Sequence, residues 1–213
     1  MKRSPGKIVG IGLNYRDHAE EQGKPLPEEP LIFAKFPSAV IDHGDSIILP
    51  AMSHQVDYEG ELAVVIGKRG RQIPEDRAHE YVEGYTIIND VSARDLQARD
   101  KQFVRAKSFD TFAPMGPRVV KDVGDVQNLA IRTWVNGDLR QSSSTNQMIF
   151  TVARLIAFIS EVCTLEPGDV IATGTPGGVG VSRKPPVFLK SGDIVKIEIE
   201  RIGILENPVK SEK

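Results

Sequence analysis

Cysteine is almost absent from this chain, since Cys163 is the only one among 213 residues. A single thiol excludes an intrachain disulfide, and such sparse use of cysteine is typical of reducing compartments. Cys163 lies in the apolar run LIAFISEVCTL, so we expect it to be packed in the interior rather than reactive.

Long apolar runs and an excess of one charge are also missing. No stretch reaches the roughly 18–20 apolar residues of a membrane span. The opening MKRSPGKIVGIG is basic, but its apolar part is too short for a signal peptide. The net charge of −2 gives no reason to expect nucleic acid or an anionic membrane as a partner. We therefore predict a cytoplasmic protein that binds neither.

Nucleotide-binding loops are incomplete. Gly10 and Gly12 lack the third glycine of a dinucleotide loop, and the glycine-rich stretch 174–180 lacks the Lys-Ser/Thr ending of a P-loop. Nucleotide binding is not expected. The backbone of 174–180 and the side chain of Thr175 could still approach a carboxylate closely, although a plain connecting loop explains the composition equally well.

A hydrophobic content of 40% and a charged content of 26% are typical of a globular protein with a real core. The length suits one large domain, or one domain with a small appendage. Strand patterns outnumber helical ones and most are joined by turns. We predict an α+β, mostly β architecture, largely antiparallel, with a few covering helices.

The most informative stretch is an apolar strand over residues 56–68 that carries two acids. Glu59 and Glu61 point to the same side, with carboxylates about 6–7 Å apart along the strand. A solvated edge strand would tolerate them. The sharper interpretation is a hard divalent cation between them, Mg²⁺ or Mn²⁺. Asp90, at the exit of the short strand that begins at Tyr85, supplies a third acid for such a site.

An acid–base pair is predicted near the N-terminus. His18 and Glu21 would share one face of a short helix capped by Asn14 or Asp17, although a solvated helical turn is the plainer interpretation. The GKPLPEEP segment that follows should be exposed. Residues 15–30 therefore have the layout of a lid.

Further polar candidates lie in 91–110, interpreted as a helix and a loop. Arg94 and Gln97 share a helix face behind Asp90, and arginine is the preferred bidentate partner of carboxylates. Lys107 lies outside any clear periodicity. The basic density of this segment suits a small anion, but a solvated face would also explain it.

Two other elements are clear. Alternating residues flank Asn136-Gly137, which predicts a hairpin. The amphipathic pattern over 145–162 predicts the longest helix, with Ser144 or Thr145 as its cap. The other histidines, His43, His54 and His79, are interpreted as loop or surface residues.

Seven segments occur in an order that resembles the fumarylacetoacetate hydrolase family over roughly residues 7–203. They are GLNYRDHAEE, the E-G-E of DYEGELAVVIGK, INDVSARDLQ, AKSFDTFAPMGP, VNGDLRQ, MIF and TGTPGGVG. The resemblance implies the family's mixed β-roll with peripheral helices, a Mg²⁺ or Mn²⁺ ion (Ca²⁺ could replace it in a crystal), and a homodimer.

The resemblance also implies roles for single residues. The metal carboxylates correspond to Glu59, Glu61 and Asp90, and the lid-borne pair that activates water corresponds to His18 and Glu21. Lys107 corresponds to a further catalytic group near the reacting oxygens, and the substrate-binding groups correspond to Asn14, Arg94, Gln97 and Thr175.

The chain begins at the 7–11 strand, so we expect residues 1–213 to form a single catalytic domain without a separate N-terminal module. This resembles the short acylpyruvate hydrolases, oxaloacetate decarboxylases and hydroxymuconate-type or 2-hydroxyhepta-2,4-diene-1,7-dioate isomerases. The leading hypothesis is a metal-dependent hydrolase that cleaves a C–C bond of a small 2,4-dioxo acid through a metal-bound enolate. Isomerisation or decarboxylation of a related 2-oxo acid is the close alternative. An inactive protein that binds a metal or a small acid is a third.

Overall fold

A seven-stranded sheet forms the centre of the molecule, which a computed structural model describes over residues 5–212. The strand order is β2-β1-β12-β6-β7-β9-β3. The strands are β1 (Ile8–Gly12), β2 (Leu31–Lys35), β3 (Val40–Ile41), β6 (Gly60–Ile66), β7 (Val82–Asn89), β9 (Ala113–Val120) and β12 (Val170–Ala172). All of β6 is buried, which explains why its sequence is continuously apolar after Glu61.

A second sheet of five strands has the order β11-β10-β13-β14-β4. Its strands are β4 (Ile47–Leu49), β10 (Ala130–Val135), β11 (Asp138–Ser144), β13 (Ile194–Ile199) and β14 (Gly203–Ser211). The predicted hairpin is confirmed: β10 and β11 meet at Asn136 (φ 54°) and Gly137 (φ 84°), both in the left-handed region that such tight turns require. A short pair, β5 (Val56–Asp57) with β8 (Ser92–Ala93), lies apart from both sheets.

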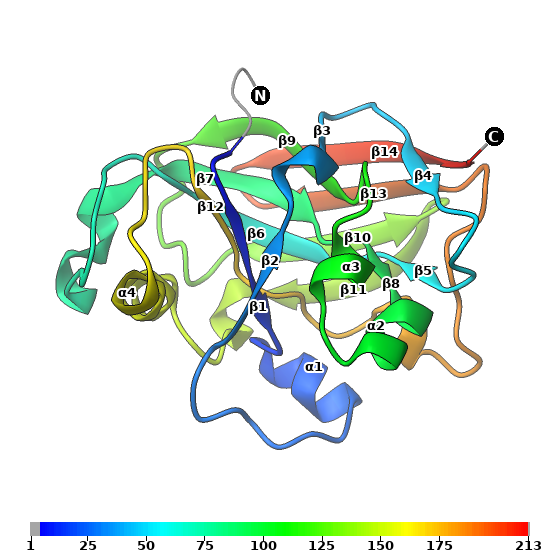
Figure 1. The fold of residues 1–213 in the computed structure, drawn as a ribbon, viewed down its shortest axis with the longest axis horizontal. Coiled ribbons are helices and arrows are strands. Elements are labelled where there is room, and N and C mark those ends of the chain that lie inside the picture. Colours follow the sequence, from blue (N-terminus) through cyan, green and yellow to red (C-terminus); the bar gives the residue numbers. More distant parts are fainter. Residues whose placement is uncertain (1–4, 213) are drawn as a thin grey trace.

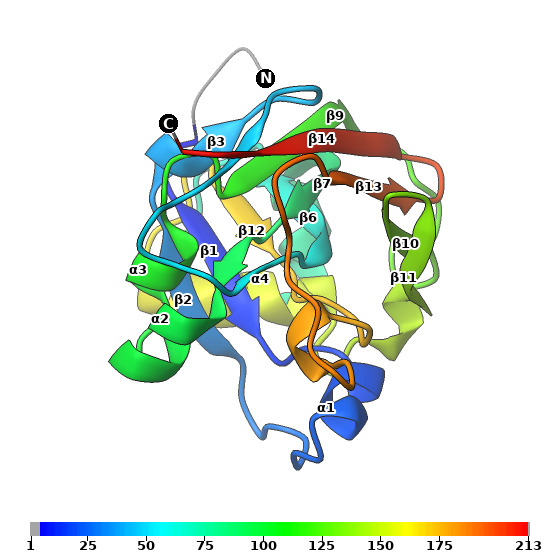
Figure 2. The same cartoon turned by 90° about the vertical axis from the view of Figure 1, so that its right-hand side faces the viewer.

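Figure 2 shows β1 and β2 on one side, β10 and β11 on the other, and β14 crossing above them. This curled arrangement confirms the predicted mostly-β roll. The sheets approach one another at Gly60, where an added Cβ would lie 2.4 Å from Oγ1 of Thr133. The glycine of the E-G-E motif is therefore required by the packing of the two sheets.

The helices are peripheral, as predicted, and they are short (Figure 1). They are α1 (Arg16–Glu21), α2 (Arg94–Asp100), α3 (Val104–Lys107) and α4 (Val152–Val162), with 3₁₀ turns η1 (Pro37–Ala39), η2 (Glu75–Tyr81), η3 (Thr145–Gln147) and η4 (Gly180–Ser182). Among residues 5–212, no helix has the length and apolar character needed to cross a lipid bilayer.

The predicted helix over 145–162 is wrong in its first half. Ser144 caps only the short turn η3, and α4 begins after Thr151, whose hydroxyl accepts the backbone N–H of Arg154. The break has a tertiary cause, because Asn14 binds the intervening backbone. Its carbonyl accepts from Ile149 N at 2.8 Å and its Oδ1 accepts from Phe150 N at 2.8 Å.

The same contacts correct a second prediction. Asn14 does not cap α1, and neither does Asp17; the N-cap residue is Tyr15, without a side-chain cap. The amide of Asn14 instead donates to the carbonyl oxygens of Phe150 and Thr173. Asn14 thus fastens β1 to the loop after β12.

Candidate active site

Three buried carboxylates gather at one end of the β6–β7 pair. Gly60 and Asn89 are opposite each other in this antiparallel pair, and the backbone N–H of Asp90 donates to the carbonyl of Glu59 at 2.9 Å. This register brings Glu59, Glu61 and Asp90 together, with one oxygen of each within 4.8 Å of the others. All three side chains are buried. The three acids that the sequence singled out therefore form one cluster that could hold a metal ion.

Two lysines hold the carboxylate of Asp90. Lys107, on α3, contacts one oxygen of Asp90 and also lies 2.8 Å from Oε2 of Glu59. Lys35, at the end of β2, places its Nζ 2.5 Å from Oδ1 of Asp90. Sequence reasoning missed Lys35. The only signal was a charged residue at the end of the apolar run LIFAK, which a strand end exposed to solvent would explain as well.

Arg94 is a fixed cation beside the cluster. Its Nη2 lies 2.7 Å from Oε1 of Glu59, and its Nε donates to Oδ2 of Asp57 at 2.9 Å. Its Nη1 donates to Oε1 of Gln97, so the predicted helix-face pair is present. Asp57, also missed, further accepts the backbone N–H groups of Gly180 and Val181. It therefore joins Arg94 to the loop after β12.

The carboxylates have opposite electrostatic environments. Burial opposes ionisation of Glu59, but Lys107 and Arg94 outweigh it and hold the pKa of Glu59 far below its usual range. Within residues 5–212, the only hydrogen-bond donor to Glu61 is the backbone N–H of Gly174, at 2.8 Å. Burial, and then the charges of Asp90 and Glu59, raise the pKa of Glu61 well above its ordinary value.

The cluster suits a divalent cation. Four buried carboxylates, including Asp57, face three cations, so one negative charge is uncompensated and Glu61 bears most of the repulsion. The donors are hard oxygen atoms, which Mg²⁺ and Mn²⁺ prefer. A bound cation would neutralise Glu61, so the residues present fit the metal that the sequence predicts.

A cavity of about 800 Å³ opens beside the cluster. Its walls include eight of the ten predicted site residues: His18, Glu21, Glu59, Glu61, Arg94, Gln97, Lys107 and Thr175. Asp90 is fully buried beneath Lys35 and Lys107, and Asn14 is fully buried beneath the loop after β12. The hydrogen bonds of Asn14 anchor that loop.

The predicted contact between His18 and Glu21 is present on α1. Nδ1 of His18 lies 3.2 Å from Oε2 of Glu21, whose other oxygen accepts the backbone N–H of Gly178 at 2.9 Å. Burial would raise the pKa of Glu21, but the hydrogen bonds from His18 and Gly178 prevail and lower it. Glu21 is therefore ionised near neutral pH and orients the imidazole.

Thr175 and the glycine loop form the opposite rim. The hydroxyl of Thr175 donates to the carbonyl of Gly60 and accepts from the amide of Gln141. Gly174 has φ +96°, and a Cβ there would lie 2.8 Å from Cβ of Asn14, so only glycine fits. This turn directs the Gly174 N–H to Glu61.

The remaining wall is apolar. Phe33, on β2, meets Phe103 edge to face with ring centroids 5.4 Å apart, and Nζ of Lys107 lies 4.8 Å from the centroid of the Phe33 ring. An added Cβ on Gly10 would lie 2.2 Å from this ring, so β1 needs glycine there to admit Phe33. Sequence reasoning did not find this wall.

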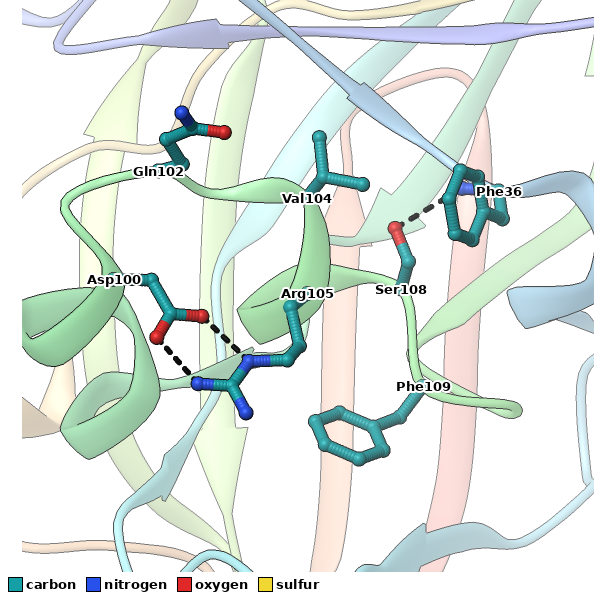
Figure 3. A pocket seen from close by; sticks show the side chains of 7 residues that line it. All are labelled: Phe36, Asp100, Gln102, Val104, Arg105, Ser108 and Phe109. Atoms are coloured by element: carbon teal, nitrogen blue, oxygen red, sulfur yellow. Dashed lines mark hydrogen bonds and ion pairs between the residues drawn. The ribbon is translucent and has the colours of Figure 1, made fainter.

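A second hollow, of about 640 Å³, lies beside α2 and α3 (Figure 3). Arg105 crosses it to Asp100, with Nε 2.5 Å from Oδ2, and Ser108 accepts the backbone N–H of Phe36. Its charged groups are already paired with each other. The cavity above Glu59 and Glu61 is the better candidate for an active site.

The chain matches a known family. The profile described as fumarylacetoacetate (FAA) hydrolase C-terminal matches residues 7–210. This chain belongs to that family, as the sequence motifs indicated.

Relatives from archaea and animals are more than half identical to this chain over the aligned residues. An uncharacterized protein of Archaeoglobus fulgidus is 57% identical over 203 residues, which is 95% of this chain and 78% of that protein. The mitochondrial oxaloacetate tautomerase of Xenopus laevis is 55% identical over 210 residues, which is 97% of this chain and 66% of that protein. The chain thus spans about two thirds of the frog protein.

Solved structures agree with the fold. The 5-carboxymethyl-2-hydroxymuconate delta-isomerase of Mycobacterium smegmatis superposes with a TM-score of 0.89 at 47% identity, over 99% of this chain and 80% of that one. The fumarylacetoacetate hydrolase of Exiguobacterium antarcticum gives a TM-score of 0.92 at 46% identity, over 98% and 76% of the respective chains.

Proposed function

We propose that this protein is an isomerase-type enzyme that moves a proton between carbon and oxygen of a small 2-oxo dicarboxylic acid, with keto–enol conversion of oxaloacetate as the leading reaction. The observation that carries the proposal is that one cavity joins the His18–Glu21 pair to the Glu59–Glu61–Asp90 cluster. The names of the frog and mycobacterial relatives support this choice over the hydrolase that we placed first from the sequence.

Glu59, Glu61 and Asp90 would hold the metal ion that the family implies. When bound, a divalent cation supplies electrophilic stabilisation of negative charge on the 2-oxo oxygen. The protein itself also contributes a positive charge, through Lys107. An ammonium group has three donors, and the two carboxylate contacts of Lys107 leave one N–H for an oxyanion in the cavity.

His18 would exchange the proton. With Nδ1 bound to the carboxylate of Glu21, a neutral imidazole has its lone pair on Nε2. Nε2 can take a proton from C3 of the keto acid and return it, while Glu21 stabilises the imidazolium that forms. Each turnover moves one proton from C3 to the oxygen on C2, or the reverse, with no other reactant.

Arg94 would position the acid. Asp57, Glu59 and Gln97 hold its guanidinium in one orientation at the cavity wall, so its remaining N–H groups can meet a substrate carboxylate without reorganisation. Thr175 and the neighbouring glycine-loop backbone would limit the space on the opposite side.

The test is a panel assay with purified protein, with and without EDTA. We expect the ultraviolet absorbance of enol-oxaloacetate to decay faster with enzyme than without it. The acceleration should be lost with EDTA and restored by Mg²⁺ or Mn²⁺. Parallel assays of CO₂ and pyruvate would detect decarboxylation. Absence of any metal-dependent acceleration would refute the proposal.

Hydrolysis of an acylpyruvate remains the second candidate. The cavity exceeds the needs of a four-carbon acid, and its apolar wall of Phe33 and Phe103 could receive an acyl chain. His18 would then deprotonate water that adds to C4. The C3–C4 bond breaks, leaving a carboxylic acid and the pyruvate enolate, which takes a proton. Metal-dependent release of pyruvate from acetylpyruvate, faster than any conversion of oxaloacetate, would favour this reaction.

Three further expectations belong to the same proposal. Residues 15–30 would act as a lid, two chains would form a homodimer, and the protein would reside in the cytoplasm. Light scattering would test the dimer, and substrate-dependent protection of 15–30 in hydrogen exchange would test the lid. A protein that shows such protection but no turnover across the panel would instead be a binding protein.

A further inference from the structure

The imidazole of His18 is bound on both nitrogen atoms. Its Nδ1 faces Glu21 at 3.2 Å, and its Nε2 lies 2.6 Å from the side-chain Nε2 of Gln22. Gln22 is the C-cap residue of α1, and Gly23 after it turns the chain with φ +61°. All three side chains, those of His18, Glu21 and Gln22, line the cavity.

For the neutral form of the His18 ring, the chemistry of the groups gives the direction of both hydrogen bonds. An ionised carboxylate only accepts, so Nδ1 of His18 carries the proton that is given to Glu21. The neutral ring then has a lone pair on Nε2. The side-chain N–H of Gln22 donates to that lone pair, whereas the reversed amide would set its oxygen against it. His18 is only 5% exposed, so bulk water is a poor competitor for this position.

We propose that Gln22 is a latch, a positioning residue whose side-chain N–H occupies Nε2 of His18, the proposed general base, until substrate enters. This inference rests on the proposed function, in which Nε2 accepts a proton. A lone pair that already accepts from Gln22 cannot accept from C3 or from water. Substrate binding must therefore exchange the Gln22 contact for a contact with the reacting group.

The position of Gln22 permits this exchange. The half-buried side chain of Gln22 follows the last helical residue and precedes the mostly exposed segment 23–29, so it can rotate away without disturbing the core. Glu21 stays fixed meanwhile, because the backbone N–H of Gly178 holds its other oxygen. The latch would thus open while the orientation of the imidazole is kept.

The decisive variant is Gln22→Met, which keeps an unbranched side chain of similar length and removes the N–H donor. The matched control is Glu20→Gln, on the exposed side of the same helix. One net hydrogen bond corresponds to a factor of about 2–10 in an equilibrium. We expect the KM for enol-oxaloacetate to fall by about this factor in Gln22→Met, with kcat unchanged, and neither to change in the control.

A spectroscopic readout is independent of turnover. In ¹⁵N-labelled protein the His18 Nε2 resonance, assigned by its loss in His18→Asn, should move toward that of a free, unprotonated imidazole nitrogen in Gln22→Met. The latch requires both the lower KM and the shifted Nε2 resonance in Gln22→Met. An Nε2 resonance that stays at its wild-type position overturns it, and so does an unchanged or higher KM, which would make Gln22 a structural or substrate-binding residue. If wild-type protein converts no 2-oxo acid, the proposed function fails, and the resonance alone then decides whether Gln22 occupies Nε2.

Discussion

The ammonium group of Lys35 lies 2.5 Å from Oδ1 of Asp90, and both side chains are wholly buried. The other oxygen of Asp90 contacts Lys107, so one carboxylate joins β2 to α3 at the base of the cavity. Two cations on one acid leave Asp90 well compensated, while Glu61 has no cationic partner among the described residues. The need for a further positive charge is therefore concentrated at Glu61.

Replacing Lys35 should destabilise the protein. Lys35→Met leaves Oδ1 of Asp90 without its nearest cation, and removing one member of a buried ion pair costs about 3–5 kcal/mol. The unfolding free energy from urea titration in EDTA should fall by about that amount. Lys210→Met, an exposed lysine on β14, is the control and should change little. A loss as small as that of the control would show that the pair does not stabilise the fold.

Glu61 should make the metal-free protein less stable as the pH rises. Burial, with the charges of Asp90 and Glu59, raises its pKa above the ordinary 4.5. Between these two values the folded state binds more protons than the unfolded state, so the free energy of unfolding falls with increasing pH in that window. The free energy of unfolding of wild type and of Glu61→Gln should be measured in EDTA as a function of pH. The difference between the two proteins should show this slope.

A saturating divalent cation should remove the slope that Glu61 causes, because the ion replaces the proton. Calorimetry should also show weaker Mn²⁺ binding by Glu61→Gln than by wild type, and release of protons on binding by wild type. Glu83→Gln, an exposed acid on β7, is the control for both measurements. Equal Mn²⁺ affinities in wild type and Glu61→Gln would remove Glu61 from the metal site.

His18→Asn should lower kcat in whichever reaction the panel detects. A positioned general base contributes about 10²–10⁴-fold, so a loss of at least about 100-fold is expected. Metal affinity should be kept, because His18 is not one of the clustered acids. His79→Asn, on the exposed turn η2, should retain full activity. Full activity in His18→Asn would refute the acid–base role.

Lys107→Met should separate metal binding from turnover. Burial would lower the pKa of Lys107, but Asp90 and Glu59 outweigh burial and raise it, so the side chain is a full cation beside two proposed ligands. Its removal should leave Mn²⁺ affinity equal or higher while kcat falls. The exposed Lys121→Met should change neither. Loss of metal affinity in Lys107→Met would instead indicate that the lysine organises the ligands.

The acid cluster could be predicted because its geometry is local. Glu59 and Glu61 flank Gly60, and Asp90 follows the strand that pairs with β6, so strand periodicity and one hairpin register place all three acids. His18 and Glu21 followed from helical spacing for the same reason. The family motifs, rather than any local pattern, suggested that His18 and Glu21 lie in the same cavity as the metal cluster.

The parts that escaped prediction depend on distant partners. Lys35 is buried because Asp90, 55 residues later, receives it, and nothing in LIFAK distinguishes this lysine from a solvated strand end. The helix over 145–162 is interrupted because Asn14, 136 residues earlier, takes the backbone N–H of Phe150. Helical periodicity continues through this break, so sequence alone gives no sign of it.

The proposed ion ligands all come from the β6–β7 pair and its two ends, whereas His18 lies on a separate short helix and Thr175 on the loop after β12. Such a division makes the molecule modular. In evolution, the segments around the cavity mouth could be replaced, which would change the reaction, while the carboxylates that bind the cation stay the same. A chimera that carries residues 15–30 of an isomerase or hydrolase relative should therefore keep its affinity for Mn²⁺ and change only its products.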